Sequence, residues 1–220
     1  MGPSIVQTEA PGTTAQHALE SLRRAIVAGE LVPGQRVLQD EVAEALGVSI
    51  APLREALAVL EQEGQVTYRP RRGYFVTELR IEDLEEIYEL RQVLEERAAR
   101  QALPALDDEA LERIRTAARD CAEAAASGDV AAELEANRRF HFAILESPGR
   151  PQAMRLIRLL WDSTEAYRAM YYNSPEERRA TIDAHDAIVD AVEARDADTL
   201  VAALATHRGR ALEVLRGILR

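Results

Sequence analysis

The stretch that decides the fold covers residues 33–66 and reads PGQRVLQDEVAEALGVSIAPLREALAVLEQEGQV. Apolar residues recur in it at helical spacing, which predicts a short helix at about 39–46 and a second helix that starts after Ser49. Gly47 ends the first helix, Ser49 is placed to cap the second, and Pro52 fits the first turn, where a missing N–H costs nothing. The core-facing side of the second helix consists of Leu53, Leu57 and Leu60. We therefore expect Ile50, Ala51 and Arg54 to lie on another side, free to meet a partner.

The segments on either side of this stretch complete a small domain. After a polar leader at 1–12, a helix is expected from Thr13, as its N-cap, to about residue 28. Beyond Gly64, alternating polarity at 65–68 and 74–76 predicts a β-hairpin. The hairpin tip contains Arg69, Arg71 and Arg72, followed by Gly73, which has the backbone freedom that tight loops need. Three helices and a hairpin predict a winged helix-turn-helix.

The rest of the chain, from about residue 81, reads as helix throughout. The breaks fall at Pro104, Ser127-Gly128, Ser147-Pro148-Gly149, Asn173-Ser174-Pro175 and near Asp196. They leave about six helices, at 82–101, 107–126, 129–146, 151–171, 175–194 and 197–218. Because the connections are short, we expect an antiparallel helical bundle. The fold class is thus mainly α, with a leader at 1–12, a winged helix at 13–78 and an all-α domain at 79–220.

Composition limits what the protein can bind. The 220 residues include 38 acidic and 27 basic ones, every basic one an arginine, for a formal net charge of −11. Such a charge opposes non-specific binding of nucleic acid, so a DNA interface must depend on a local cluster such as the arginines of the hairpin tip. The sequence has no apolar run of about 20 residues and no signal-peptide pattern, so we expect a cytoplasmic protein. The single cysteine, Cys121, excludes an intramolecular disulfide framework.

The second helix of a helix-turn-helix enters the major groove with its N-terminal residues against the base edges. The residues at this position are Ser49, Ile50, Ala51 and Arg54. Arg54 suits a bidentate contact to guanine or a phosphate clamp, whereas Ile50 and Ala51 offer apolar contact to thymine methyl groups. An ordinary three-helix core with a solvated face is the alternative interpretation. The basic hairpin tip favours DNA binding, because its composition suits phosphate or minor-groove contact.

Three of the four histidines lie on apolar stripes of the predicted helices, namely His141, His185 and His207, and Asn137 lies one turn before His141. Each ring alone could be a core histidine with an ordinary hydrogen-bond partner. Leaving such a group unpaired costs ~1–3 kcal/mol, and one divalent metal would satisfy all three rings. Imidazole suits zinc, nickel, copper and iron. Zinc is our first candidate, with nickel, manganese or iron as alternatives.

This donor set also suggests a ligand. Three imidazoles and an amide are neutral, so the metal keeps its charge and open positions that an anionic small molecule, most simply a carboxylate, can fill. Arg91 lies on the stripe of the helix at 82–101, where an arginine needs a partner. It can anchor the carboxylate of an effector, or it can pair with Glu95 one turn later.

The sequence resembles a known family in two places. Residues 15–77, through the run at 33–66 and the following PRRGYFV, resemble the DNA-binding domain of GntR-family regulators. The resemblance implies DNA contacts from the start of the recognition helix, from Arg54, and from Arg71, Arg72 and Gly73. The family commonly has Arg-Thr where this chain has Ile50-Ala51, which implies a different operator sequence.

Residues 80–218 resemble the FCD subfamily of these regulators. The pieces that carry the likeness are EDLEEIYELRQVLEERAAR, NRRFHFAIL, DAHDAIVDAV and ATHRGRAL. The resemblance implies metal ligands beside an effector cavity, which match Asn137, His141, His185 and His207. It also implies homodimers formed by the helical domains, which place two winged helices on a two-fold symmetric operator.

We therefore expect a homodimeric, ligand-responsive transcriptional regulator rather than an enzyme. Two other classes stay open. A metal with an open position can activate water, which would make the helical domain a metal-dependent hydrolase. The sequence offers no well-placed general base, because Glu146 and Asp186 lie off the stripes of the ligands. The other class is a DNA-binding protein without an effector, in which the histidines are structural.

Overall fold

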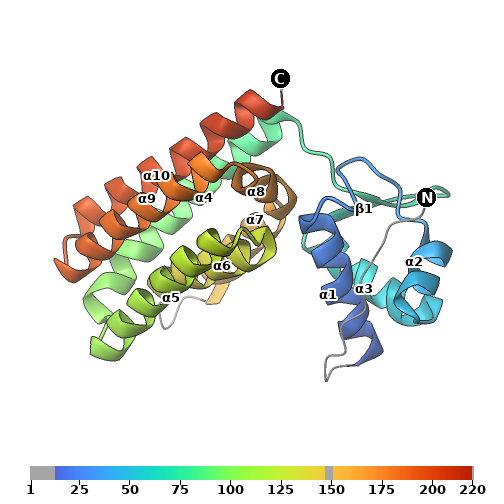
Figure 1. Ribbon diagram of the computed structural model, residues 1–220, viewed down its shortest axis with the longest axis horizontal. Helices are drawn as coiled ribbons and strands as arrows, with labels where there is room; N and C mark the ends of the chain where they lie inside the picture. Colours follow the sequence, from blue (N-terminus) through green and yellow to red (C-terminus); the bar gives the residue numbers. More distant parts are fainter. Residues whose placement is uncertain (1–12, 147–150, 220) are drawn as a thin grey trace. The chain divides into compact units, whose positions relative to one another are not determined.

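The structure is a computed structural model that describes residues 13–146 and 151–219. The contacts divide the chain into two compact units (Figure 1). One unit holds the chain up to Leu79 together with Trp161–Ala166, and the other holds Arg80–Leu160 together with the chain from Tyr167 onward. The predicted leader at 1–12 and the predicted break at Ser147-Pro148-Gly149 lie outside the described residues.

The first unit is a winged helix-turn-helix, as predicted. Its helices are α1 (Thr14–Val27), α2 (Gln39–Leu46) and α3 (Ile50–Gln62), and its antiparallel strands are β1 (Val66–Arg69) and β2 (Gly73–Val76). The register pairs Val66 with Val76 and Arg69 with Gly73. An isolated bridge between Arg36 and Phe75 attaches the segment before α2 to the hairpin. The wing is thereby held against the start of the helix-turn-helix.

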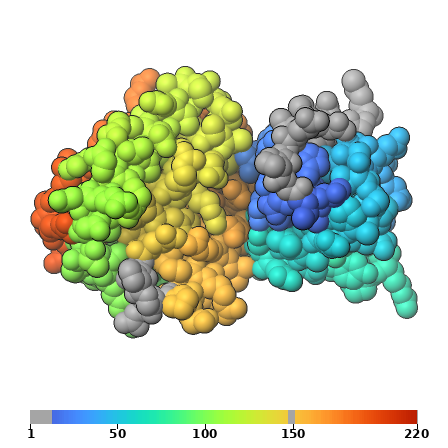
Figure 2. All heavy atoms as spheres, turned by 90° about the horizontal axis from the view of Figure 1, so that it is seen from below, coloured from blue at the N-terminus to red at the C-terminus, as the bar shows by residue number. Residues whose placement is uncertain are grey.

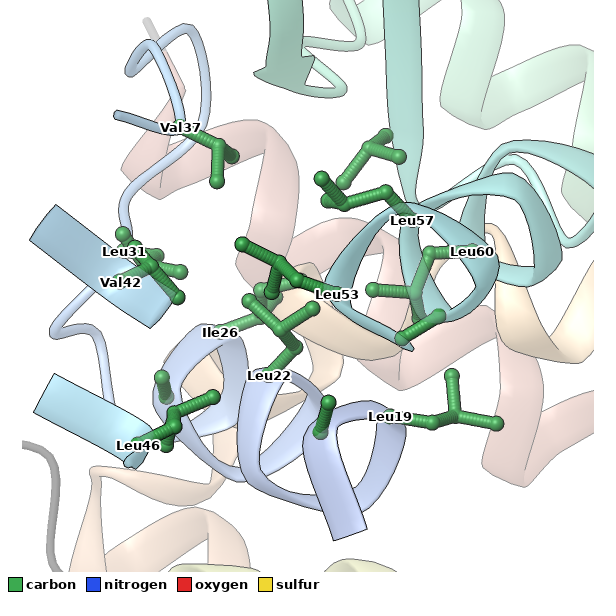
Figure 3. Close-up of a cluster of buried hydrophobic side chains, with 14 of the residues drawn as sticks. Leu19, Leu22, Ile26, Leu31, Val37, Val42, Leu46, Leu53, Leu57 and Leu60 are labelled. Carbon is green, nitrogen blue, oxygen red and sulfur yellow. The ribbon is translucent and has the colours of Figure 1, made fainter. Parts of the chain in front are cut away.

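Leucines from α1 and α3 form the centre of this unit (Figure 3). Leu22, Leu53, Leu57 and Leu60 are each 0% exposed, and complete burial of such a side chain contributes about 1.5–3 kcal/mol. Val37, Val42 and Leu46 extend the same cluster. The apolar side that the sequence assigned to the second helix of the motif is therefore its core-facing side.

The helix ends follow local chemistry, with one exception. Thr13 caps α1, because its hydroxyl accepts a hydrogen bond from the backbone N–H of Gln16. Gly47 ends α2 in the left-handed conformation, with φ of 65°. Ser49 occupies the cap position of α3, but its side chain makes no cap hydrogen bond. The expected cap was wrong in that respect, and the Ser49 side chain stays exposed on the surface.

The second unit contains only helices among its described residues, which confirms the predicted helical bundle. Its elements are α4 (Ile81–Ala102), a 3-10 turn (Leu103–Ala105), α5 (Asp108–Ser127), α6 (Val130–Leu145), most of α7 (Pro151–Asp162) and of α8 (Glu165–Tyr172), α9 (Pro175–Glu193) and α10 (Ala197–Ile218). The adjoining ends of α7 and α8, within Trp161–Ala166, belong to the first unit. The helix predicted at 151–171 is in fact two helices. Thr164 causes the break, since both its backbone N–H and its hydroxyl donate to the carbonyl of Trp161 and end the helical ladder there.

The helices of this unit pack against one another in pairs. α4 packs against α6 and α10, α5 packs against α6 and α9, and α9 packs against α10. Figure 2 shows α5 and α6, coloured green to yellow, side by side on the surface of the unit. No helix among the described residues is both long enough and apolar enough to cross a membrane.

Candidate metal centre and nucleic-acid interface

Three histidines from three helices meet inside the second unit. His141 lies on α6, His185 on α9 and His207 on α10. The centroids of their rings are 5.1 to 5.3 Å apart. Each ring offers a nitrogen, and these nitrogens all lie within 4.8 Å of one another. The structure thus brings together the three imidazoles that the sequence analysis assigned to one site.

The spacing of these nitrogens suits a metal ion. Zinc–nitrogen bonds of about 2.0–2.1 Å in tetrahedral geometry place the ligand nitrogens about 3.3 Å apart. The three nitrogens lie at most 4.8 Å apart. Each nitrogen–nitrogen distance therefore has to shorten by roughly 1.5 Å or less to reach the spacing of a zinc site.

Two residues at the centre also carry polar atoms that have no hydrogen-bond partner among the described residues. The two ring nitrogens of His185, which is 1% exposed, and Oδ1 of Asn137, which is 3% exposed, form no hydrogen bond within the described part of the chain. Asn137 lies one turn before His141 on the buried face of α6. Buried polar atoms nearly always have a partner, so these atoms point to a ligand.

The surroundings hold all three rings neutral at pH 7. Burial lowers the pKa of His141 well below its ordinary value, and the neighbouring His207 and His185 lower it further. Burial, followed by His207, lowers the pKa of His185 in the same way. Burial lowers the pKa of His207 to about 4, with Arg91 and Arg208 acting in the same direction. Neutral imidazole is the form that binds a metal.

Two buried arginines next to the rings share one carboxylate. Arg91 donates from Nε to Glu95 at 2.8 Å, and Arg208 donates to the other oxygen of Glu95 at 2.7 Å. The helix-local pair of Arg91, which the sequence analysis set beside an effector-anchoring role, is therefore present. With two positive charges and one negative charge, these three residues leave a net positive charge beside the rings.

Arg168 on α8 is a further buried cation, and the sequence analysis missed it. Its side chain is close enough to His141 to lower the pKa of that ring, and close enough to Tyr172 to oppose the effect of burial on the phenol pKa. Arg168 follows Ile157, Trp161 and Thr164 at helical spacing, so it lies on the same buried stripe. Its position among the tyrosines of α8 could have indicated that this arginine is buried.

Glu133 on α6 was missed as well. It is 1% exposed, its carboxylate oxygens form no hydrogen bond with a described residue, and Arg178 lies 3.7 Å away. Burial raises the pKa of Glu133 to about 7, although Arg178 acts in the opposite direction. In the sequence, Glu133 stands four residues before Asn137, which stands four residues before His141. This spacing places Glu133 on the same helix face and could have revealed it.

The predicted DNA-contacting residues gather around α3 and the wing of the first unit. Ser49, Ala51 and Arg54 are exposed. Ile50 differs from the expectation, because it is half-buried and packs against the core cluster rather than facing away from it. Its position in the first turn of α3 turns part of its side chain inward.

The wing tip forms a tight turn with exposed arginines. Arg72 donates its backbone N–H to the carbonyl of Arg69 at 2.9 Å. Arg71 and Gly73 have positive φ angles of 62° and 88°. The guanidinium of Arg69 lies 4.4 Å from the centre of the Phe75 ring, while Arg71 and Arg72 extend from the turn as exposed side chains.

Gln39 connects the recognition helix to the wing, a role that the sequence analysis did not assign. Its Oε1 accepts a hydrogen bond from Nε of Arg54 at 3.1 Å. A Cβ atom placed on Gly73 would lie 3.8 Å from Nε2 of Gln39 and 4.0 Å from Nε of Arg36. The start of α2, the first turns of α3 and the wing tip therefore form one surface.

Comparison with protein families identifies both units. Residues 14–76 match the model of "Bacterial regulatory proteins, gntR family", and residues 86–210 match that of the "FCD domain". The Nta operon transcriptional regulator of Aminobacter aminovorans is 30% identical over 191 residues, which cover 84% of this chain and 88% of that one. The HTH-type transcriptional regulator McbR of Escherichia coli is 29% identical over 177 residues, 80% of each chain.

Solved structures agree with these matches. E. coli McbR/YncC has a TM-score of 0.82 at 26% identity, over 95% of this chain and 100% of that chain. A putative regulator from Rhodococcus sp. RHA1 has a TM-score of 0.79 at 25% identity, again over 95% and 100%. Fold and relatives define the class of protein, a transcriptional regulator that binds DNA.

The chain belongs to the gntR family of bacterial regulators and carries an FCD domain. It is a regulator rather than an enzyme. Of the two carboxylates near the ligands in the sequence, Glu146 forms a surface ion pair with Arg158 and Asp186 is exposed.

Proposed function

We propose that the protein is a homodimeric regulator whose affinity for operator DNA is controlled by a small carboxylate effector bound at a divalent metal. In this proposal residues 13–78 bind DNA and residues 79–220 hold the metal, the effector and the dimer contacts. The observation that carries the proposal is the convergence of three imidazole nitrogens to within 4.8 Å of one another in a buried interior.

The metal would be held by His141, His185 and His207, with Asn137 as a fourth ligand. The neutral state of the rings and the unpartnered nitrogens of His185 support this assignment. Three imidazoles and an amide oxygen fit zinc best, with nickel, manganese or iron as alternatives.

The charge of the site supports an anionic effector. Neutral ligands leave the metal its full charge, and Arg91, Arg208 and Glu95 add a net positive charge next to it. An anion is needed to offset so much positive charge in a buried region. A carboxylate can bind the open metal position, with Arg91 and Arg168 as cations nearby.

DNA binding would use the surface of the first unit. Ser49, Ile50, Ala51 and Arg54 would enter the major groove at the start of α3. The wing would contact phosphate or the minor groove through Arg69, Arg71 and Arg72, with Gly73 permitting the turn. Gln39 would orient the Arg54 side chain through their hydrogen bond.

Control of DNA affinity requires that the effector distinguish two arrangements of the dimer. A ligand with equal affinity for both arrangements would change nothing. We propose that the effector favours one arrangement through its contacts at the metal and at Arg91, and that the two arrangements space the wings differently.

A thermal-shift screen with and without metal tests the effector site. Full-length protein is stripped with a chelator, reloaded with Zn²⁺, and exposed to a panel of mono-, di- and tricarboxylates. We expect at least one carboxylate to raise the midpoint of unfolding of the Zn²⁺-loaded protein, because a ligand that binds the folded state stabilises it by mass action.

The same carboxylate should have no effect on the stripped protein or on His185→Ala. It should also change the affinity for DNA duplexes that the protein selects from a random pool. A shift of equal size in the stripped protein would show that the metal has no part in effector binding. A panel in which every member leaves the loaded protein unchanged would contradict a carboxylate effector.

A further inference from the structure

A buried carboxyl group of the second unit lies away from the histidine rings. Glu133, near the start of α6, is 1% exposed, and neither of its carboxylate oxygens forms a hydrogen bond with a described residue. Its ion pair with Arg178 of α9 is long, at 3.7 Å. Buried carboxyl groups nearly always have hydrogen-bond partners, because burial without them is costly. The two oxygens of Glu133 therefore indicate a bound ligand.

Other contacts hold the guanidinium of Arg178 in its place. Its Nε donates a hydrogen bond to the backbone carbonyl of Tyr172 at 2.7 Å. The turn before α6 lies close to it as well, since a Cβ atom placed on Gly128 would be 3.3 Å from a terminal nitrogen of Arg178. Arg178 thus offsets part of the charge of Glu133 from a fixed position, while both carboxylate oxygens stay open to another hydrogen-bond donor.

Two contacts between α6 and α9 give the distance from Glu133 to the rings. Glu133 meets Arg178 near the start of both helices, and His141 meets His185 further along, with ring centroids 5.3 Å apart. The second contact lies eight residues later on α6 and seven residues later on α9, so the two helices run parallel here. At 1.5 Å per residue, Glu133 is separated from the rings by roughly 11 Å along the helix axes.

Buried polar side chains continue between these two ends. Asn137 lies midway on α6, and its Oδ1 forms no hydrogen bond with a described residue. On α8, Arg168 is close enough to His141 to lower the pKa of that ring. Both Arg168 and Glu133 are close enough to Tyr172 to act on its phenol pKa, the arginine lowering it and the glutamate raising it. A row of polar groups therefore connects the rings with Glu133.

The surroundings of Glu133 decide which chemical group fits it. An ionised carboxylate only accepts hydrogen bonds, so the ligand has to bring a donor, either a hydroxyl or an ammonium group. An ammonium group would add a third positive charge beside Arg178 and Arg168, and like charges repel strongly in a buried region. A hydroxyl donates a hydrogen bond without adding charge, and it can also accept one from a protonated carboxyl group. A hydroxyl is therefore the better partner.

We propose that Glu133 forms the far end of the effector site and binds a hydroxyl group, so that the effector is a hydroxycarboxylate. Its carboxylate would face the metal and Arg91, and its hydroxyl would donate to Glu133. A metal–oxygen bond and a hydrogen bond together take up about 5 Å of the separation, which leaves roughly 6 Å between the two oxygens of the effector. An extended chain of about four or five carbons spans this distance. The inference rests on the proposed effector site and specifies the chemistry of its ligand.

A matched series of small acids tests this chemistry. The Zn²⁺-loaded full chain is titrated calorimetrically with straight-chain carboxylates of four and of five carbons, which carry a methyl, a hydroxyl or an ammonium group at the far end. We expect the best hydroxy acid to bind roughly 10- to 100-fold more tightly than the plain acid of the same length, because its hydroxyl bonds to a charged acceptor that otherwise stays unpaired. The amino acid of that length should bind no more tightly than the plain acid.

Variants at Glu133 test whether this residue is the acceptor. Glu133→Leu removes the carboxylate, so the hydroxy acid should bind only as tightly as the plain acid, whose own affinity should change little. Glu133→Gln keeps an acceptor oxygen and should retain part of the preference. Glu135→Leu, at an exposed position of the same helix, is the matched control and should retain all of it. Circular dichroism shows that each variant is folded.

The outcomes separate this inference from the function on which it rests. Equal affinities for hydroxy and plain acids in the unmodified chain would overturn the inference and leave a carboxylate effector standing. A preference for the hydroxy acid that persists in Glu133→Leu would overturn the role of Glu133, and tighter binding of the amino acid would overturn the choice of a hydroxyl. Binding of no member of the series to the loaded chain would contradict the effector site itself.

Discussion

At the scale of single residues, the buried carboxyl group of Glu133 should make the stability of the protein depend on pH. Burial raises the pKa of Glu133 to about 7 in the folded protein, whereas an unfolded chain has an ordinary glutamate value near 4.3. The folded state therefore binds more protons than the unfolded state between these values, so the free energy of unfolding falls as pH rises through that window.

Glu133→Gln should prevent this fall in the free energy of unfolding at high pH, because the amide stays neutral at every pH. We expect the variant and the unmodified protein to have similar stability near pH 4, and the variant to be more stable by about 1–3 kcal/mol near pH 8. Urea unfolding at the two pH values measures the difference. Glu135→Gln, an exposed position on the same helix, is the control. Parallel stability curves for Glu133→Gln and the unmodified protein would refute the prediction.

Asn137 offers a second test at this scale. Asn137→Asp replaces a neutral oxygen by an anionic one, so Zn²⁺ should bind more tightly in competition with a chelator. The same change lowers the net positive charge of the site, so the affinity for a carboxylate effector should fall. If Asn137 is not a ligand, neither affinity will change by more than the exposed control Glu135→Gln changes it.

At the scale of elements, Glu95 links two helices. It accepts hydrogen bonds from Arg91 on its own helix and from Arg208 on α10, and all three are at least 93% buried. Glu95→Ala leaves two guanidinium groups without their shared carboxylate, so we expect a loss of about 3–5 kcal/mol in the free energy of unfolding. Glu96→Ala, next to it on the more exposed side of α4, should cost less than 1 kcal/mol. Similar losses for the two variants would contradict the role of Glu95.

Elements with a clear periodicity were predictable, and the breaks between them were less so. The second helix of the motif was placed correctly because Leu53, Leu57 and Leu60 repeat at helical spacing and Gly47 and Gly64 bound it. The helix predicted at 151–171 hid a break, because Thr164 ends a helix only through hydrogen bonds that its sequence position does not reveal. Arg168 was overlooked although it follows Trp161 and Thr164 on one helical stripe.

Some residues of the candidate site could be predicted from the sequence and others could not. His141, His185 and His207 stood out because polar rings on apolar stripes need a partner. Glu133 did not, since an acidic residue near the start of a helix is usually on the solvated face. The pairing of Arg91 with Glu95 was open in the sequence, because helix spacing permits both that pair and a contact with a ligand. Arg208, which joins them from α10, depends on tertiary packing that one sequence does not reveal.

At the scale of the whole molecule, a net charge of −11 must coexist with DNA binding. The wing concentrates Arg69, Arg71 and Arg72 in one turn, so phosphate contact is local. Arg71→Ala and Arg72→Ala together should weaken binding to selected and unselected duplexes alike. They should also reduce the slope of log affinity against log salt by about 2 if each arginine neutralises one phosphate.

Arg54→Ala should behave differently, by relaxing sequence preference at one base position. A base contact carries discrimination, whereas a phosphate contact carries affinity. Binding measured over a salt series, on the selected duplex and on single-base variants of it, distinguishes the two cases. An unchanged salt slope in the wing variant would contradict phosphate contact by the tip.

The proposed site holds one cation between three imidazole rings. Calorimetric titration of Zn²⁺ into the chelator-treated full chain tests it most directly, with His185→Ala as the comparison and His17→Ala as the control. The account predicts one tight site per chain, kept in His17→Ala and lost in His185→Ala. Absence of tight binding by the unmodified chain, or equal binding by His185→Ala, would contradict it.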